Sequence, residues 1–196
     1  MFSNQSSHPT LIQHSIGMNS SVVTKVLLAV VGSLALWASA KVSIPFYPVP
    51  MTMQTFVVLT IGMAYGWRLG AATIMLYLAE GALGLPVFSA TPERGIGLAY
   101  MFGPTGGYLL GFLFSATVVG WLAERGWDRN VVSTLAAMTI GTAIIFATGV
   151  LWLGSIIGWD KPILALGATP FMLGAALKIA LAATTLPFAW KLLKKK

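Results

Sequence analysis

The sequence predicts an all-α integral membrane protein with six transmembrane helices, and three observations support that prediction. Hydrophobic residues make up 57% of the 196 residues and charged residues only 9%, whereas soluble domains average about a quarter charged residues. Mean hydropathy is +0.82. The apolar residues fall in helix-length runs separated by proline- and glycine-containing segments, and at about 20 residues per crossing the chain has room for roughly six. We expect one membrane domain over residues 22–196, preceded by a mobile cytoplasmic tail over residues 1–21.

The first predicted span, residues 22–40, follows a tail rich in serine, asparagine and glutamine. Small residues recur on it three or four positions apart, and such faces let helix backbones approach closely in lipid. Two uses are open: packing against other helices of this chain, or docking to another membrane subunit. The residues are Ala29, Gly32, Ser33, Ala35 and Ser39.

Residues 41–52 hold three prolines within six positions and cannot be helical throughout, so we expect an ordered outer loop. Phe46 and Tyr47 in this loop are either anchors at the membrane interface or a lid over a ligand. The next two spans, joined by a tight turn, cover residues 53–66 and 69–83.

A long loop, residues 85–103, leads to the fourth span. We expect that span to begin at Pro104, because a proline at the first helical position loses no hydrogen bond. The last three spans cover residues 104–123, 131–157 and 171–190, with a charged connection at residues 124–130 and a further loop at residues 158–170.

Lysine and arginine predict the orientation of these spans. With six crossings, one side of the membrane holds eight of the twelve cationic residues, the other side holds three, and Lys178 lies within the sixth span. Cytoplasmic loops are enriched in Lys and Arg, so both termini should be cytoplasmic. The three residues on the outer side are Lys41, Arg94 and Lys161.

Two charged residues, Glu80 and Lys178, interrupt the apolar spans. A charge at the centre of a membrane helix costs roughly 2.5–3.5 kcal/mol on insertion scales, so each needs a compensating partner. Counting about 1.5 Å per residue from the cytoplasmic ends places both at a similar level in the outer half. They could form an interhelical salt bridge, or both could face a polar pocket covered by the loop that carries Arg94.

The residues around such a pocket suit a small amphiphilic acid. Arg94 and Lys178 could bind one carboxylate, with the N–H groups of residues 105–107 at the start of the fourth span as further donors. Glu80 would accept hydrogen bonds from N–H donors of the ligand. Aromatic and methionine side chains would form the remaining wall.

The residues that are absent argue against several functions. The sequence has no cysteine, and its predicted spans hold no histidine and no pair of acids, so we expect no enzyme, no metal site and no resident cofactor. It has no P-loop and no nucleic-acid-binding motif, so ATP-driven transport would need ATPases on other chains. A stand-alone secondary transporter remains an alternative, although no inverted repeat is evident.

Three motifs occur in order: VPMTMQT over Val49–Thr55, LY followed by GALGLPVF within Leu76–Phe88, and GPTGGYL over Gly103–Leu109. Together they resemble the BioY family, the biotin-binding S subunits of energy-coupling-factor (ECF) transporters. The resemblance implies a six-helix S-subunit fold and high-affinity capture of biotin from outside. It also implies docking to a membrane coupling subunit with two ATPase subunits, in the plasma membrane of a bacterium or archaeon.

The resemblance further implies roles for individual residues. Arg94 and Lys178 match family positions that bind the valerate carboxylate of biotin. Where members often carry an aspartate three residues before that lysine, this chain has Ala175, and where members commonly have an uncharged residue it has Glu80. We therefore hypothesise that Glu80 binds the ureido N–H groups instead. The candidate substrate-binding set is Glu80, Arg94, Lys178, Tyr47, Gln54, Tyr77, Gly106 and Tyr108.

Overall fold

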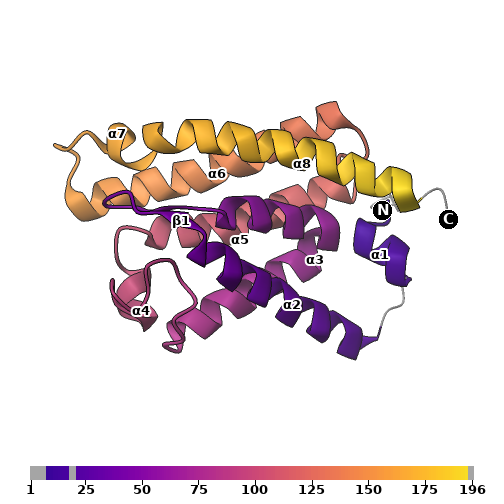
Figure 1. The fold of residues 1–196 in the computed structure, drawn as a ribbon, viewed down its shortest axis with the longest axis horizontal. Helices are drawn as coiled ribbons and strands as arrows, with labels where there is room; N and C mark the ends of the chain where they lie inside the picture. The colour runs from indigo at the N-terminus through magenta and orange to yellow at the C-terminus, as the bar shows by residue number, and fades with distance from the viewer. Residues whose placement is uncertain (1–7, 18–20, 194–196) are drawn as a thin grey trace, which may run out of the picture.

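The computed structural model describes residues 8–17 and 21–193, which form an elongated bundle of helices (Figure 1). The long helices are α2 (Val22–Lys41), α3 (Gln54–Ala82), α5 (Gly106–Ala123), α6 (Val131–Ile157) and α8 (Met172–Leu193). The short elements are α1 (Leu11–Ile16), the antiparallel strands β1 (Ser43–Ile44) and β2 (Met51–Thr52), α4 (Gly97–Met101), α7 (Ile163–Gly167) and the 3-10 helix η1 (Thr169–Phe171). The all-α fold class predicted from composition is therefore confirmed, with one two-residue strand pair in the loop before α3.

Helix α3 is a hairpin of two helical arms. At Gly66 the backbone has φ 80° and ψ 175°, which is outside the helical region. Gln54 and Tyr77, one on each arm, are joined by a hydrogen bond of 2.7 Å from Nε2 to the phenol oxygen, although a straight helix would separate them by about 35 Å. The arms are therefore antiparallel, and the chain turns where the sequence predicts the boundary between the second and third spans.

Five helices in the described part of the chain are long and apolar enough to cross a membrane: α2, α3, α5, α6 and the stretch from α7 through α8. The sequence predicts six. The difference arises in α3, because its two arms count as one helix and each is shorter than the roughly 20 residues of a full crossing. Large apolar side chains are exposed on these helices, among them Leu27, Val31, Leu151 and Leu177.

Helix α5 packs against both α3 and α6, and glycines let the three helices approach closely. A Cβ atom at Gly62 of α3 or at Gly141 of α6 would overlap the side chain of Val119 on α5. At Gly107 on α5, a Cβ atom would overlap Trp152 on α6. Small residues thus set the spacing of these helices, which is the kind of contact that stabilises helix pairs in lipid.

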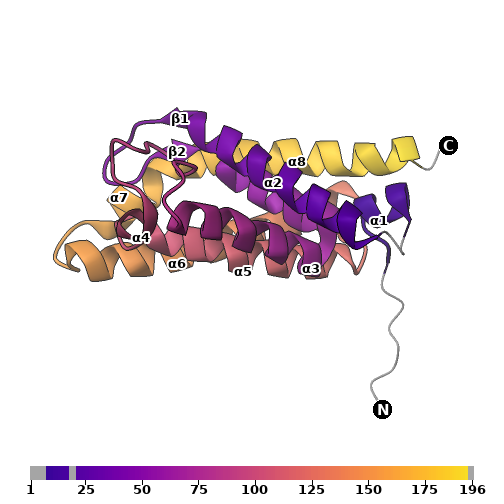
Figure 2. The same ribbon diagram turned by 90° about the horizontal axis from the view of Figure 1, so that it is seen from below.

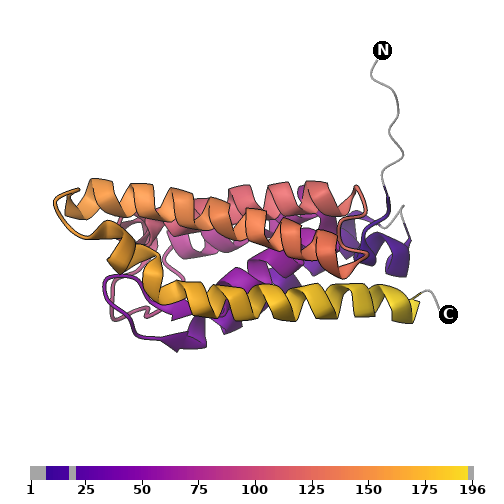
Figure 3. The same cartoon turned by 90° about the horizontal axis from the view of Figure 1, so that it is seen from above.

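The two ends of the bundle carry different elements. The strand pair, α4 and α7 gather at one end in every view, whereas α1 and the C-terminal end of α8 lie at the other (Figure 1, Figure 2, Figure 3). At that second end the ring of His14 packs edge-on against Trp190, with centroids 5.4 Å apart. Both described ends of the chain therefore lie at the same end of the bundle.

Within the expected tail, the described residues 8–17 include a short helix, α1, that packs against the bundle. Thr10 begins α1 in a capping box with Gln13, and Thr10 and Leu11 are buried. The sequence signal was the capping pair itself, a threonine followed three residues later by glutamine. The rest of the expected tail that is not described comprises residues 1–7 and 18–20, and the terminal residues Lys194–Lys196 also lie outside the described ranges.

The small-residue face of α2 is used mainly within the chain. Its buried members are Gly32, Ser33 and Ser39. A Cβ atom at Gly32 would lie 2.5 Å from Thr73 Cγ2 on α3, so this face is the contact between α2 and α3. These three residues are buried within the chain, whereas Ala29 is half-buried and Ala35 exposed. Docking of this face to another subunit stays a prediction.

Candidate ligand-binding site

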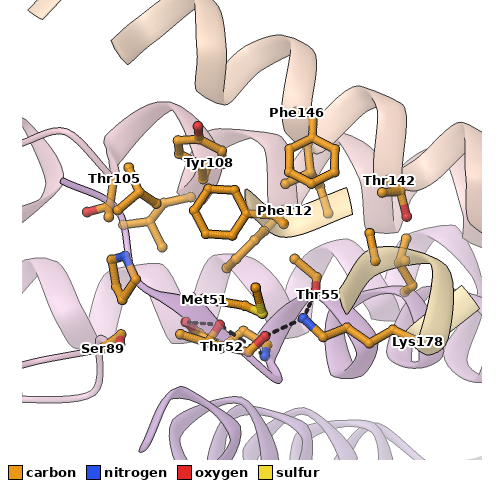
Figure 4. A pocket seen from close by; sticks show the side chains of 18 of the residues that line it. Met51, Thr52, Thr55, Ser89, Thr105, Tyr108, Phe112, Thr142, Phe146 and Lys178 are labelled. Carbon is orange, nitrogen blue, oxygen red and sulfur yellow. Dashed lines mark hydrogen bonds between the residues drawn. The ribbon is translucent and has the colours of Figure 1, made fainter. Parts of the chain in front are cut away.

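A cavity lies toward the end of the bundle that carries the strand pair, between α3, α5, α6 and α8 (Figure 4). The empty space at this site is about 760 Å³ when the part open to solvent is included. Apolar side chains dominate the lining, with polar groups between them. The lining residues are Val49, Pro50, Met51, Thr52, Gln54, Thr55, Leu59, Ser89, Tyr100, Thr105, Tyr108, Leu109, Phe112, Thr142, Ile145, Phe146, Phe171, Ala175 and Lys178.

Lys178 is the one residue with a formal charge among the described residues that line this cavity. Its Nζ donates to Thr52 O at 2.6 Å and to Thr55 Oγ1 at 3.0 Å, and neither acceptor is charged. Lys178 has no carboxylate partner, because the single ion pair among the described residues joins Lys161 and Asp160. An ammonium group in an apolar cavity without a counter-charge is energetically costly, so Lys178 is suited to bind an anionic ligand.

Gln54 and Tyr77 form a polar pair at one wall. Gln54 lines the cavity and is held on one side by Thr52, whose hydroxyl donates to Gln54 Oε1 at 3.3 Å. Tyr77 is fully buried and does not line the cavity. Its hydroxyl accepts from Gln54 and donates to Val87 O at 2.9 Å, so Tyr77 fixes the position of Gln54 from behind.

Tyr108 lines the cavity, and its hydroxyl donates to Gly167 O in α7 at 2.7 Å. Gly106, predicted as a binding residue, does not line it. The N–H of Gly106 donates to Gly103 O at 3.0 Å in the turn before α5, and α5 begins at Gly106, not at Pro104. The glycines of this motif allow close packing, and its residues that line the cavity are Thr105, Tyr108 and Leu109.

Arg94 and Tyr47 lie outside the cavity and join two of the loops at its end of the bundle. Arg94 Nη1 donates to Pro48 O at 3.1 Å, and its guanidinium carbon lies 5.8 Å from the centre of the Tyr47 ring. Tyr47 is 83% exposed. The pair thus links the loop before β2 to the loop after α3, a position that suits a lid more than a wall of the cavity.

Glu80 is directed away from the cavity. Its carboxylate accepts a hydrogen bond from Ser33 Oγ on α2, and Glu80 is not among the lining residues. It also forms no ion pair with Lys178, because the described residues contain only the pair between Lys161 and Asp160. The expected salt bridge with Lys178 is therefore not formed, and Glu80 links α3 to α2 through Ser33. The expected contact between Glu80 and the ureido group stays a prediction.

The sequence-based set missed most of the cavity wall. Thr142, Ile145 and Phe146 come from the middle of α6 and Phe112 from α5, where they look like ordinary residues of an apolar span. The helical face that each presents depends on its packing partners, and the sequence carries no separate signal for it. Ser89 lies next to the GALGLPVF motif, so adjacency to that motif could have pointed to it.

The model of the family described as BioY matches residues 10–195. The chain belongs to the BioY family. The resemblance drawn from the three motifs is thereby confirmed, and the curated BioY relatives are named as transporters, not as enzymes.

Curated BioY relatives match much of the chain. The Biotin transporter BioY of Rhizobium etli is 35% identical over 169 residues, covering 83% of this chain and 88% of that protein. The Biotin transporter BioY of Thermotoga maritima is 36% identical over 144 residues, covering 74% and 82%. The Probable biotin transporter BioY of Pyrococcus horikoshii is 35% identical over 143 residues, covering 73% and 82%.

A solved structure shares the fold of this BioY chain. The S-component for biotin from an ECF-type ABC transporter superposes with a TM-score of 0.73 and 21% sequence identity, covering 86% of this chain and 92% of that one. The S-component fold predicted from the sequence is thereby confirmed.

Proposed function

We propose that this BioY chain binds biotin with high affinity and takes it up as the substrate-binding subunit of an ECF-type transporter. The observation that carries the proposal is the position of Lys178, an ammonium with two uncharged acceptors at the wall of a largely apolar cavity. The valerate carboxylate of biotin would supply the missing counter-charge. Membership of a family whose curated members are named biotin transporters supports the same substrate.

The remaining lining suits the rest of the ligand. Biotin has an apolar body between its carboxylate and a ureido ring with two N–H groups. Met51, Phe112, Phe146 and Phe171 are apolar lining residues that can cover such a body. Of the predicted binding residues, we assign direct contact to Lys178, Gln54 and Tyr108, and a closing role over the cavity to Arg94 and Tyr47.

We further propose six crossings, in one membrane domain beginning at residue 22, with both termini in the cytoplasm. Support comes from the antiparallel arms of α3, which would add one crossing to the five helices. It also comes from the position of α1 and the end of α8 at one end of the bundle (Figure 1). An even number of crossings returns a chain to the side on which it began. The excess of Lys and Arg on that side makes it the cytoplasmic one.

The transport partners belong to the same proposal. The chain has no P-loop, so we assign ATP hydrolysis to two ATPase subunits and their coupling to a membrane subunit, in a bacterial or archaeal plasma membrane. The alternative is a stand-alone transporter for biotin or a similar amphiphilic acid. Uptake of radiolabelled biotin by cells with and without coupling subunits separates the two, since only the stand-alone protein works without them.

Titration of the purified protein with biotin tests the substrate and the role of Lys178. We expect tight binding by the wild type, and a loss of at least about 30-fold in affinity for Lys178→Met, the lower range for a buried charged pair. The methyl ester of biotin, which lacks the charge, should bind the wild type weakly and should lose little more in the variant. Lys161→Met is the matched control, because Lys161 is exposed and paired with Asp160. If Lys178→Met bound biotin as tightly as the wild type, Lys178 would not bind the ligand carboxylate.

A further inference from the structure

Ser89 carries a polar group that the fold leaves without a partner. Its side chain is 3% exposed, it lines the cavity, and Ser89 Oγ has no hydrogen-bond partner among the described residues. A buried hydroxyl without a partner is costly. A bound ligand with a polar group can supply the missing hydrogen bond.

The segment that presents Ser89 is held by a lysine from another helix. Lys41, the last residue of α2, donates from Nζ to Pro86 O at 3.0 Å, to Phe88 O at 3.1 Å and to Thr91 O at 3.2 Å. A fourth contact, to Thr91 Oγ1, is 3.3 Å long. These acceptors lie on both sides of Ser89 in the chain. One ammonium therefore organises the whole segment 86–91.

The backbone next to Ser89 needs such support. Ala90 has φ 52°, in the left-handed region that side chains with a Cβ atom rarely adopt. Residues held in this region persist when the surrounding contacts determine them. On the other side of Ser89, Phe88 stacks on Tyr100 with centroids 5.0 Å apart. The ring stack and the Lys41 ammonium together fix the segment.

Ser89 and Lys178 lie on opposite sides of the cavity in the close view (Figure 4). If Lys178 binds the carboxylate, the Ser89 side receives the other end of the ligand, which in biotin is the ureido ring. The cavity lining offers that ring no acidic side chain, because position 175 is an alanine and Glu80 does not line the cavity. A neutral hydroxyl oxygen can accept a hydrogen bond from a ureido N–H.

We propose that Ser89 binds the ureido head of the ligand and that Lys41 is the positioning residue that holds Ser89 in place. The proposal rests on the assignment of biotin as substrate. Through its contacts with segment 86–91, Lys41 connects the C-terminal end of α2 to the binding site. Lys41 itself does not touch the ligand.

The first experiment measures biotin affinity of Ser89→Ala. We expect a loss of about 3- to 10-fold, the effect of one neutral hydrogen bond. Without ligand, the variant should be as stable as the wild type or more so, because it removes a buried hydroxyl without a partner. Against a biotin analogue methylated on both ureido nitrogens, the variant and the wild type should differ by less than about 2-fold. Unchanged biotin affinity, or an equal loss with the methylated analogue, would overturn the role of Ser89.

The second experiment tests Lys41 with a readout that needs no ligand. In Lys41→Met the segment loses its four contacts, and we expect trypsin to cleave after Arg94 at least about fivefold faster, as for a locally unfolded loop. Biotin affinity should fall at least as far as in Ser89→Ala. The losses should also be non-additive in the double variant, because Lys41 acts through Ser89. Lys161→Met is the control for removing an exposed outer lysine.

The outcomes separate the two proposals. If the wild type does not bind biotin, the proposed function fails, and the cleavage rate after Arg94 still decides whether Lys41 holds the segment. If the wild type binds biotin and Lys41→Met matches it in cleavage and affinity, the positioning role is wrong. Should Lys41→Met fail to fold, Lys41→Gln, which keeps two N–H donors but no charge, is judged by the same measurements.

Discussion

Gln54 and Tyr77 stand 23 positions apart in the sequence and are joined by a hydrogen bond of 2.7 Å across the two arms of α3. Tyr77 extends the connection to Val87 O at 2.9 Å. This chain of two hydrogen bonds ties the start of the first arm, the second arm and the loop beside the cavity together. Each donor and acceptor in it is buried, so each depends on its partner.

Tyr77→Phe should therefore destabilise the protein. The substitution leaves Gln54 Nε2 and Val87 O without their partner in a buried place, at a cost of about 1–3 kcal/mol. Thermal unfolding in detergent measures it as a lower apparent Tm. Tyr47→Phe is the stability control, because the Tyr47 side chain is 83% exposed. Equal Tm values for the two variants would contradict the prediction.

Gly66→Ala should disrupt the turn between the arms. Gly66 has φ 80°, and a Cβ atom there would lie 2.6 Å from Glu124 Oε1 and 3.0 Å from Thr10 Cγ2. Gly84→Ala separates the two causes, since Gly84 also has positive φ (94°) but open space around its Cβ position. We expect about 1–2 kcal/mol of destabilisation in Gly84→Ala from the backbone alone, and more in Gly66→Ala. If Gly66→Ala and Gly84→Ala lowered folded yield and Tm equally, the overlap with Glu124 and Thr10 would have no effect.

Asp128→Asn should change how stability depends on pH. Asp128 lies in the connection between α5 and α6, fully buried, and accepts from Trp190 Nε1 at 2.6 Å. Burial raises the pKa of its carboxyl above the ordinary range, and the Trp190 bond and the Arg129 charge offset this only in part. At pH values between the unfolded pKa of about 3.9 and the raised folded pKa, the Asp128 carboxyl is protonated more often in the folded state than in the unfolded state. Wild-type stability therefore falls as pH rises through that window.

The neutral amide of Asp128→Asn keeps an acceptor for Trp190 and does not ionise. The Tm of the variant minus that of the wild type should increase as the pH rises above about 4, and it should level off once the pH exceeds the raised folded pKa. Asp160→Asn, which removes an exposed carboxylate, serves as the control. A difference that stays constant across this range would show that Asp128 does not titrate as its burial implies.

Glu80→Gln should keep biotin affinity within about twofold of the wild type, because no ligand hydrogen bond is lost. The amide keeps an oxygen that can accept from Ser33 Oγ, and residue 80 does not line the cavity. Calorimetric titration with biotin measures the affinity of this variant, and Lys178→Met, measured in the same way, shows the size of a loss caused by removing a ligand contact. A loss of tenfold or more in Glu80→Gln would restore the direct contact with the ureido group that the position of Glu80 argues against.

Helix bounds were predictable where one apolar run forms one helix. The run from Val131 to Ile157 coincides with α6, because the thickness of a bilayer forces apolar runs of this length. The break at Gly66 was visible as the boundary between two apolar stretches. Lys178 could be assigned to a cavity because a lone cation in an apolar helix needs a polar environment.

The direction of each polar side chain was decided by tertiary structure. Glu80 and Lys178 are similar in the sequence, as single charges in apolar helices, yet Lys178 faces the cavity and Glu80 faces Ser33. Which face of a helix meets a cavity depends on its packing partners, and those partners lie far away in the sequence. The same reason hid Ser89, whose position depends on Lys41 some 48 residues earlier. The sequence by itself determined the family, the all-α fold class and the need for a binding site. The tertiary structure alone decided which residues form that site, because only packing brings α2, the loop after α3 and α8 to their places around one cavity.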